Sequence, residues 1–386
     1  MRIALYQPWI YLYGGLEKSL LEVVTRSEHD WVVYTGHYEP ENTFPEFKNV
    51  DVRVLNPTSV KRTLFGTLFS AIQITRQKIP TEDFDAVAVW CDGLGDLITF
   101  RNHSLPLMNI CSTPLRAAFD PVYERQALAD SGFLYRLSYK LFKHAFRKVD
   151  KAAWRHFDSV ITTSTEVKNR IIEGKLCTDE TKMVMAYPGI DYKSNLESIT
   201  YEPFILLPGR IMWTKNIQLG ITAFLKAKLP PPWKLKIAGF LDEKSGSYLD
   251  DLKVLANDTP NIEFVISPSQ EVLSQLYQQA AFCLFPPLNE DWGIVPLESM
   301  NYAKAVIANA SGGPKESIED GKTGFLLKPD DDAWAEKIKL LAGDTSMCKS
   351  MGVIANERAK LFSWGEFVKR IDETLSSRIK GEPSEV

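Results

Sequence analysis

Short runs of apolar and β-branched residues alternate with helical patterns along almost the whole chain. Most of these runs are continuously apolar, which is typical of parallel strands buried on both faces. Helical patterns such as 16–25 and 63–77 lie between them, so the sequence predicts an α/β protein with doubly wound sheets. The strands expected in the first half are 3–6, 31–34, 52–55, 86–90, 107–110 and 160–162.

The same alternation begins again after a polar stretch at 187–203, which contains two prolines and is typical of a linker. A chain of 386 residues is too long for one ordinary core, so we expect domains over 1–195 and 196–386. A last helix at about 364–379 suits either domain, and the tail 381–386 is expected to fray. The strands expected in the second half are 204–207, 234–238, 262–265, 282–285, 305–308 and 324–327.

Two Rossmann-like domains that face each other form a deep cleft, and the carboxyl ends of their parallel strands point into it. In this predicted fold class the C-terminal helix can cross back to the first domain. The fold alone allows a glycosyltransferase, a sugar-nucleotide epimerase or a periplasmic-type binding protein. The residues at the strand ends must therefore decide the function.

Composition excludes several classes of function. A net charge of −4 gives no reason to expect a nucleic acid partner. The five cysteines are scattered without a metal-binding spacing, so neither a metal site, a cofactor nor a disulfide framework is expected. The first residues form too short an apolar run for a signal peptide, and no stretch approaches the roughly 20 apolar residues of a membrane span. We therefore expect a cytoplasmic protein.

The segment from Asn289 to Glu298 follows an expected strand and carries two carboxylates. Pro296 suits the first turn of a helix, which would place Glu298 in the same turn. Backbone N–H groups at a helix start attract a phosphate, and Gly293 lets the backbone approach a ligand closely. Glu298 can accept hydrogen bonds from both hydroxyls of a ribose, and Glu290 can reach those of a second sugar. An ordinary helix start explains Glu298 equally well.

Glu290 and Glu298 match the Glu-x7-Glu motif of the family 4 retaining glycosyltransferases, which are group 1 glycosyl transferases of the GT-B fold. Residues 305–316 resemble the P-V-I-A…G-G…E stretch of that family, and residues 320–326 resemble its D-G-x-T-G-F-L stretch. The resemblance implies that the C-terminal domain binds a nucleotide-sugar donor and that the N-terminal domain faces the acceptor. The donor-binding residues that it implies in this segment are Asp291, Trp292, Gly293, Ile294, Val295 and Glu298.

A second loop follows the strand expected at 204–207 and contains Arg210 and Lys215. Two cations on a strand-to-helix loop can hold a diphosphate, the first through a fork of N–H groups and the second as a point charge. A short basic loop alone more often marks a solvated surface. This loop resembles the G-R-x-x-x-x-K segment of the same family, which implies that Arg210 and Lys215 stabilise the departing diphosphate without a metal and act with Glu290 in catalysis.

Two further segments complete the implied donor site. Gly14 and Gly15 resemble the G-G-x-E-[RK] loop that faces the donor in the family, although a Gly-Gly pair alone is weak evidence. Residues 262–277 resemble its base-binding strand and loop, in which backbone groups near Ile266 read the base. Tyr277 itself is interpreted as a core residue.

Residues 111–116 resemble a subfamily segment, C-H-T-P-x-R, whose His lies near the transferred sugar. This chain has Ser112 at that position. A hydroxyl can donate one hydrogen bond but cannot become cationic, so Ser112 is a candidate sugar contact that supplies no positive charge.

Between residues 136 and 155 the chain carries seven Lys or Arg residues and one acid, Asp150. Apolar residues are interleaved with them at near-helical spacing, and such a basic amphipathic helix can rest on anionic lipid. The favoured interpretation is a helix that faces the core and has a solvated basic side. A peripheral contact with the inner face of a membrane is the alternative.

The expected function is a retaining hexosyltransferase of polysaccharide biosynthesis. Its expected donor is UDP-glucose, with GDP-mannose second, and its expected acceptor is a polysaccharide or a lipid-linked saccharide. The resemblance implies front-face displacement, in which the donor phosphate helps to take the acceptor proton. Two alternatives stay open: a sugar-nucleotide 2-epimerase, which shares the fold, and a non-catalytic nucleotide-sugar-binding partner of another transferase.

Overall fold

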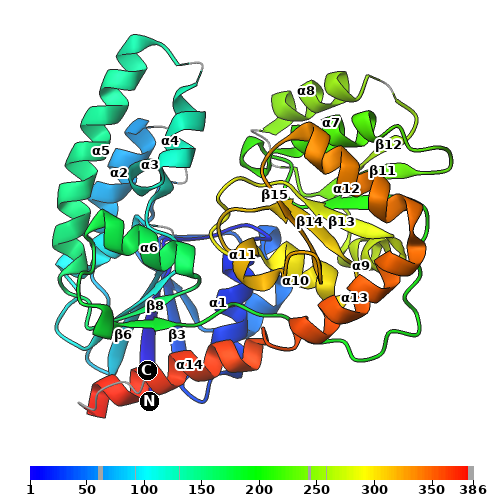
Figure 1. Ribbon diagram of the computed structural model, residues 1–386. Coiled ribbons are helices and arrows are strands. Elements are labelled where there is room, and N and C mark those ends of the chain that lie inside the picture. Colours follow the sequence, from blue (N-terminus) through cyan, green and yellow to red (C-terminus); the bar gives the residue numbers. More distant parts are fainter. Residues whose placement is uncertain (60–63, 92, 130, 242–244, 258, 381–386) are drawn as a thin grey trace. The chain divides into compact units, whose positions relative to one another are not determined.

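The computed structural model describes residues 1–59, 64–91, 93–129, 131–241, 245–257 and 259–380 (Figure 1). The chain divides into two compact units, one formed by Met1–Pro188 with Trp364–Val386 and the other by Gly189–Ser363. The division therefore falls after Pro188, slightly before the expected residue 195. The last helix, α14 (Trp364–Lys380), groups with the first unit. The expected frayed tail, 381–386, lies outside the described residues.

The first unit is built on a parallel sheet with the strand order β5-β3-β1-β6-β7-β8-β9. Its central strands are buried along their length, which explains their continuously apolar sequences. A small pair of two-residue strands, β2 (Trp9–Ile10) and β4 (His37–Tyr38), lies outside this sheet. The main strands are β1 (Arg2–Tyr6), β3 (Asp30–Thr35), β5 (Val52–Val54), β6 (Ala86–Cys91), β7 (Leu107–Cys111), β8 (Ser159–Thr162) and β9 (Met183–Met185).

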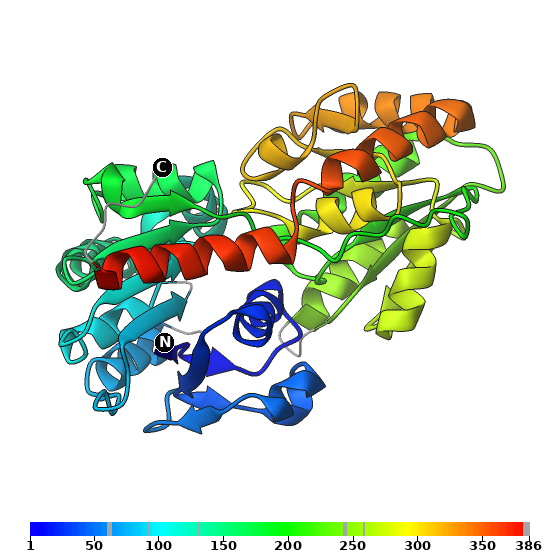
Figure 2. The same ribbon diagram turned by 90° about the horizontal axis from the view of Figure 1, so that it is seen from below.

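Helices cover this sheet. The helix α14 packs against α1, β8 and β9, and it buries Phe367, Ile371 and Leu375 (Figure 2). The carboxylate of Asp372 on α14 accepts hydrogen bonds from the hydroxyl of Ser27 and the backbone N–H of Glu28. The other helices of this unit are α1 (Gly15–Arg26), α2 (Leu64–Ile74), η3 (Gly95–Phe100), α3 (Arg116–Phe119), α4 (Pro121–Leu128), α5 (Phe133–Trp154) and α6 (Thr165–Gly174).

The second unit has a parallel sheet with the order β12-β11-β10-β13-β14-β15, which is the strand order of the classic dinucleotide-binding fold. Every strand expected from the sequence is present in the two units, with ends that differ by at most one residue. The sequence did not indicate β2, β4 and β9, which are short. The strands of the second unit are β10 (Phe204–Pro208), β11 (Lys234–Gly239), β12 (Ile262–Ile266), β13 (Phe282–Phe285), β14 (Val306–Asn309) and β15 (Gly324–Leu327).

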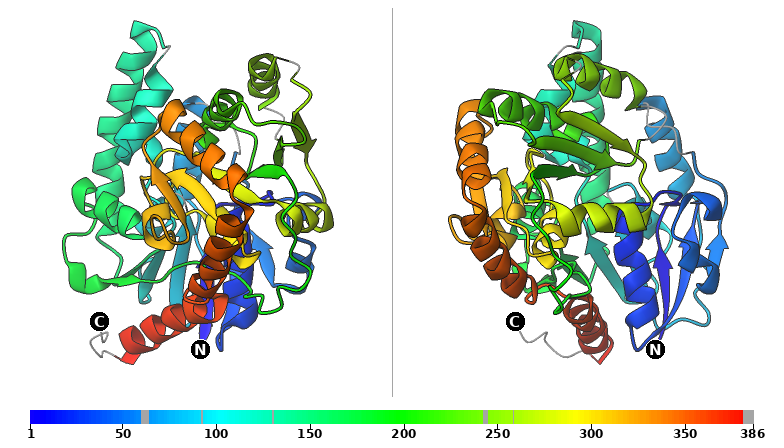
Figure 3. Two further views of the ribbon diagram at one scale, coloured as in Figure 1. Left: turned by 45° about the vertical axis from the view of Figure 1, so that its right-hand side comes forward. Right: turned by 90° about the vertical axis from the view of Figure 1, so that its right-hand side faces the viewer.

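Alternate residues of β10 enter different cores. Ile205 and Leu207 pack with residues of α7, α8 and α12, whereas Phe204 and Leu206 pack with residues of α9. Figure 3 shows α7 and α8 on one side of this sheet and α9 on the other. The helices of this unit are α7 (Ile217–Ala227), α8 (Gly246–Ala256), α9 (Gln270–Gln279), α10 (Ile294–Asn301), α11 (Pro314–Ser317), α12 (Asp331–Gly343) and α13 (Thr345–Ala359).

Candidate functional site

The candidate site of the second unit lies where β10 and β13 are neighbours. The sheet grows from β10 toward β12 on one side and from β13 toward β15 on the other, so the loops that follow these two strands diverge. Ligands of open α/β sheets bind at this topological switch point, outside the carboxyl ends of the strands. A small pocket at this place is lined by Leu207, Pro208, Gly209, Arg210, Lys215, Ile217, Pro286 and Pro287.

An ion pair joins the two loops. The ammonium Nζ of Lys215 lies 2.8 Å from Oε1 and 2.9 Å from Oε2 of Glu290. Each side chain is 18% exposed, so the pair is half-buried at the mouth of the loops. The sequence assigned one residue to the diphosphate and the other to the sugar, and the structure brings them into contact.

Arg210 lies in the same loop as Lys215 and is half-buried beside Gly209. Its guanidinium forms no hydrogen bond or ion pair with the described residues. The N–H groups of that guanidinium can therefore turn to an anionic ligand in the pocket.

The Glu290 loop rests on the turn after β14. The backbone N–H of Gly313 donates to the carbonyl of Glu290 over 2.9 Å, and the N–H of Asn289 donates to Oγ of Ser311 over 3.0 Å. Gly312 has a φ of +67°, and a Cβ at this position would collide with the carbonyl oxygen of Glu290. The paired glycines of this turn are thus needed for two backbones to meet, which positions Glu290.

The helix α10 begins at Ile294, so Pro296 lies in its first turn, as expected. Gly293 precedes it with a φ of +87°, which lets the chain turn into the helix early. The expected position of Glu298 in the first turn is therefore wrong, since the residue lies in the second turn. The N–H groups of Ile294 and Val295 are those at the helix start.

Glu298 has a buried partner. The phenol of Tyr277 on α9 donates to Oε2 of Glu298 over 2.8 Å. Burial and the nearby carboxylate raise the pKa of Tyr277 well above its usual value, so the phenol stays a proton donor. The ring of Tyr277 stacks on Tyr302, with centroids 5.4 Å apart. The interpretation of Tyr277 as a core residue holds for its ring and missed the contact made by its hydroxyl.

Three other predicted donor-site residues occupy different environments. Ile266 ends β12 at the same carboxyl edge of the sheet and is 39% exposed. Trp292 is buried, and its ring centroid lies 5.3 Å from that of Phe362, so its side chain anchors the loop. Asp291 lies between Glu290 and Trp292 and is half-buried.

Gly14 and Gly15 lie in the first unit, where Gly14 caps α1 and Gly15 is its first residue. A Cβ on Gly14 would collide with the carboxylate of Glu17, which is buried and folds back over the helix start. A larger residue at position 14 would therefore have to move the Glu17 carboxylate away from the helix start.

Ser112 follows β7 in the first unit and is half-buried. Its Oγ accepts a hydrogen bond of 2.8 Å from the indole N–H of Trp90, a buried residue of β6. The hydroxyl keeps one proton to donate. Trp90 was not singled out from the sequence, because an apolar strand gives no sign of the partner that its indole N–H will take.

The structure thus gathers Arg210, Lys215, Glu290 and Glu298 with their supporting loops in the second unit, and holds Gly14, Gly15 and Ser112 in the first. Within the described ranges, no group of three or more His, Cys, Asp or Glu residues could hold a metal ion. In the same part of the chain, no helix combines the length and apolar character needed to cross a membrane.

Residues 191–358 match the family model "Glycosyl transferases group 1". This match spans most of the second unit and supports the expected resemblance to group 1 glycosyl transferases and the predicted hexosyltransferase class. Among curated proteins, the chain is 24% identical to the α-1,3/1,6-mannosyltransferase ALG2 of Rhizomucor pusillus, over 94% of this chain and 89% of that protein. It is 26% identical to the protein of the same name from Neurospora crassa, over 96% and 90%. The human protein is 32% identical over 41% of each chain.

Solved structures support the fold. HepE of Anabaena, in complex with UDP and glucose, superposes with a TM-score of 0.75 at 18% identity, over 98% of this chain and all of that one. WaaG, a glycosyltransferase involved in lipopolysaccharide biosynthesis, superposes with a TM-score of 0.70 at 17% identity, over 97% and 99%. The predicted fold class, with two Rossmann-like domains of the GT-B kind, is confirmed.

Proposed function

We propose that this protein is a retaining mannosyltransferase that moves mannose from GDP-mannose to a lipid-linked saccharide. The observation that carries the proposal is its similarity to α-1,3/1,6-mannosyltransferases over nearly its whole length. UDP-glucose was the first expected donor and GDP-mannose the second, and these relatives favour the second. A retaining course fits the family.

The proposed roles follow from the geometry of the second unit. Arg210 and Lys215 lie on one loop beside the pocket, and their positive charges suit the diphosphate of a donor. Both charges stabilise the diphosphate as the sugar bond breaks, when negative charge builds up on the leaving group. The backbone N–H groups at the start of α10 also suit the negative charge of a phosphate.

The two carboxylates are assigned to different parts of the donor. Glu290 is fixed by the ion pair with Lys215 and is assigned to the hydroxyls of the sugar. Glu298 is fixed by Tyr277 and is assigned to the ribose. Backbone groups near Ile266, at the same edge of the sheet, are assigned to the base. The chemistry then depends on orientation and charge, with the donor phosphate taking the acceptor proton.

The acceptor side of the proposal belongs to the first unit, which also carries Gly14 and Gly15, assigned to the donor, and Ser112, assigned to the transferred sugar. A saccharide carried on a lipid is held at a membrane surface. We therefore include a peripheral position on the cytoplasmic face of a membrane in the proposal.

The test begins with donor binding. Because a ligand that binds the native state raises the melting temperature, GDP-mannose should raise it more than UDP-glucose, ADP-glucose or a dTDP-sugar. Transfer is then measured with radiolabelled GDP-mannose and a detergent-solubilised lipid-linked saccharide. A clear preference for a UDP-sugar in both assays would contradict the proposed donor.

The same preparation separates the alternatives. Conversion of GDP-mannose to an epimer without any acceptor would indicate an epimerase. Arg210→Ala should lower turnover by more than about tenfold, because a hydrogen-bonded charge is lost from the transition state. Turnover that is unchanged in Arg210→Ala and Glu298→Ala would show that the site assignment is wrong.

A further inference from the structure

The helix α2 of the first unit turns its apolar side to solvent. Phe65, Leu68, Phe69 and Ile72 are 86%, 53%, 56% and 41% exposed. Their spacing of three, four and seven residues places them on one stripe of the helix. No residue of α2 carries a charge. A surface helix normally shows the opposite arrangement, with its apolar stripe toward the core.

The polar residues of α2 point toward the protein. The hydroxyl of Ser70, a buried residue, donates to the carbonyl of Ser59 over 2.8 Å. The amide of Gln73 accepts from the N–H of Ser59 and donates to the carbonyl of Pro57. Ile74 is fully buried. These contacts fix which side of α2 faces outward, so the exposure of the apolar stripe follows from the packing of the first unit.

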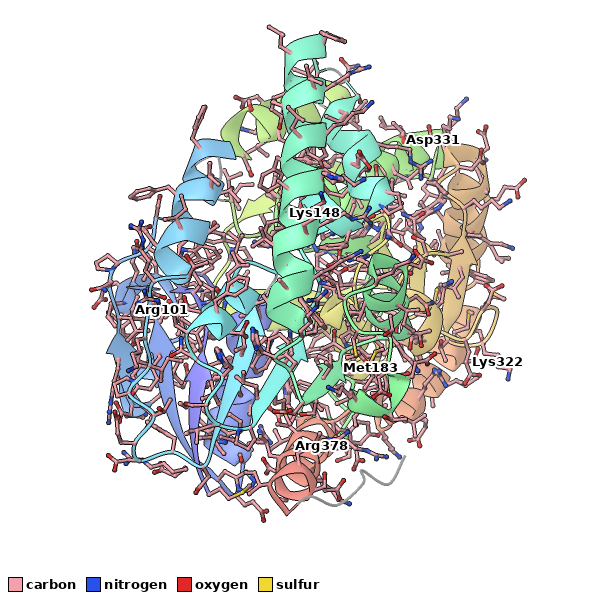
Figure 4. The ribbon with its side chains drawn as sticks, turned by 90° about the vertical axis from the view of Figure 1, so that its left-hand side faces the viewer. Arg101, Lys148, Met183, Lys322, Asp331 and Arg378 are labelled. Atoms are coloured by element: carbon pink, nitrogen blue, oxygen red, sulfur yellow. The ribbon has the colours of Figure 1, made fainter. Side chains whose placement is uncertain are left out.

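The first half of α5, in the same unit, exposes a second group of large apolar side chains. Phe133, Leu134, Leu137 and Leu141 are 79%, 79%, 47% and 65% exposed, whereas Phe146 and Trp154 in the second half are buried. The favoured core-facing interpretation of this helix therefore holds for its second half and for Tyr139 of its first half, whereas those four side chains of the first half face outward. Both α2 and α5 belong to the first unit, where α2 packs against η3 and the end of α5 at Trp154 does the same. Figure 4 shows both helices, with Lys148 marking the second half of α5.

Basic side chains accompany this apolar surface. Arg136, Lys140 and Lys148 of α5 are exposed, and the one acid of the helix, Asp150, is fully buried. An exposed face that combines large apolar side chains with cations, and has no exposed acid on α2 or α5, complements a bilayer with anionic headgroups. A second protein copy would have to bury the same cations against each other, which is unfavourable.

We infer that the exposed stripe of α2 and the first half of α5 form a lipid-docking surface for an anionic membrane. The aromatic and leucine side chains enter the boundary between headgroups and acyl chains, and the cations stay at the headgroups. The inference rests on the proposed function in one respect, since a lipid-linked acceptor would be met at that membrane. Beyond the proposed function, the inference identifies α2 and α5 as the helices that contact the membrane.

The test is flotation of the full-length protein with vesicles of phosphatidylcholine, with and without phosphatidylserine. The wild type should bind the anionic vesicles, and Phe65→Ser combined with Phe69→Ser should lower binding by more than about tenfold, because two exposed rings no longer enter the bilayer. Val254→Ser, at a 78% exposed position of α8 in the second unit, is the matched control and should bind like the wild type.

The cations are tested separately. Lys140→Gln combined with Lys148→Gln should remove most of the preference for anionic over neutral vesicles, and added salt should do the same in the wild type. Equal binding of the wild type and the Phe65→Ser/Phe69→Ser variant would overturn the inference. A wild-type dimer in light scattering that this variant abolishes would also overturn it, in favour of a second copy.

Failure of this inference is distinguishable from failure of the proposed function. With a detergent-solubilised acceptor, the Phe65→Ser/Phe69→Ser variant should keep wild-type turnover, because neither residue belongs to the donor site. Vesicle binding without transfer from GDP-mannose would leave the docking surface standing and remove the proposed function. Transfer without vesicle binding would do the reverse.

Discussion

Lys215 and Glu290, 75 residues apart in the chain, form an ion pair in which one ammonium contacts both carboxylate oxygens, at 2.8 and 2.9 Å. An ammonium has three protons to donate, so Lys215 can donate to a bound diphosphate and to Glu290 at the same time. The two residues are therefore expected to affect donor binding in opposite directions, which separates their roles.

Glu290→Gln should bind GDP as tightly as the wild type or a few fold more tightly, because Lys215 is no longer neutralised. Its turnover should fall by at least about tenfold, because the sugar is less well oriented. Lys215→Met should raise the Kd for GDP by about tenfold, as expected for a lost hydrogen bond to a charged group. Calorimetry and transfer assays measure both. The control is Lys226→Met, at an exposed lysine of α7. Similar losses of GDP binding in Glu290→Gln and Lys215→Met would contradict these separate roles.

Tyr277→Phe should weaken GDP binding by about five- to tenfold, because Glu298 loses the donor that orients it toward the ribose. A GDP analogue without the ribose hydroxyls should bind the wild type and the variant equally. The measured quantity is the ratio of the two dissociation constants. Tyr248→Phe removes a hydrogen-bonded hydroxyl of a half-buried residue on α8 and should leave this ratio unchanged. Equal ratios in Tyr277→Phe and the wild type would exclude a role in ribose recognition.

Gly312→Ala should displace the Glu290 loop, because its Cβ would collide with the carbonyl of Glu290 and its φ is +67°. The strain is expected to cost about 1–3 kcal/mol of stability and most of the turnover. Thermal melting and transfer assays report the two effects. The matched control is Gly343→Ala at the end of α12, where a Cβ meets nothing within 4 Å. A fully active Gly312→Ala variant would show that the loop does not depend on this turn.

Lys304 of the second unit is fully buried, and burial lowers its pKa to about 7. Between this value and the ordinary 10.5, the unfolded chain holds a proton that the folded chain lacks, so this group makes stability rise with pH. Lys304→Met should remove that dependence. As the pH rises through this range, the free energy of unfolding of the wild type should increase relative to that of Lys304→Met by about 1 kcal/mol for each pH unit. Urea unfolding across this range measures it.

The exposed Lys349→Met loses the same charge from α13 and serves as the control for Lys304→Met. Its stability should follow the wild-type pH dependence, because Lys304 stays buried in this variant. Parallel curves for the wild type and Lys304→Met would mean that the buried ammonium stays charged.

The fold was largely predictable because continuous apolar runs of four to six residues between helical patterns are typical of parallel strands buried on both faces. The start of α10 was not, since it depends on the positive φ of Gly293. Periodicity indicated a helix at 63–77, but an apolar stripe is normally assigned to the core, so the sequence could not tell that Phe65 faces outward. Contacts between distant segments, such as that of Tyr277 with Glu298, were equally hidden, because motif spacing says nothing about partners.

The packing of α14 has a consequence for synthesis. The first unit needs a helix whose residues follow the whole of Gly189–Ser363. At about 5 to 20 residues per second, a ribosome spends roughly 10 to 35 s on that stretch. During this time α1, β8 and β9 lack the helix that covers them, so the nascent chain completes its second unit before its first. A nonsense codon just before residue 364 would consequently damage the part of the protein that was translated earliest.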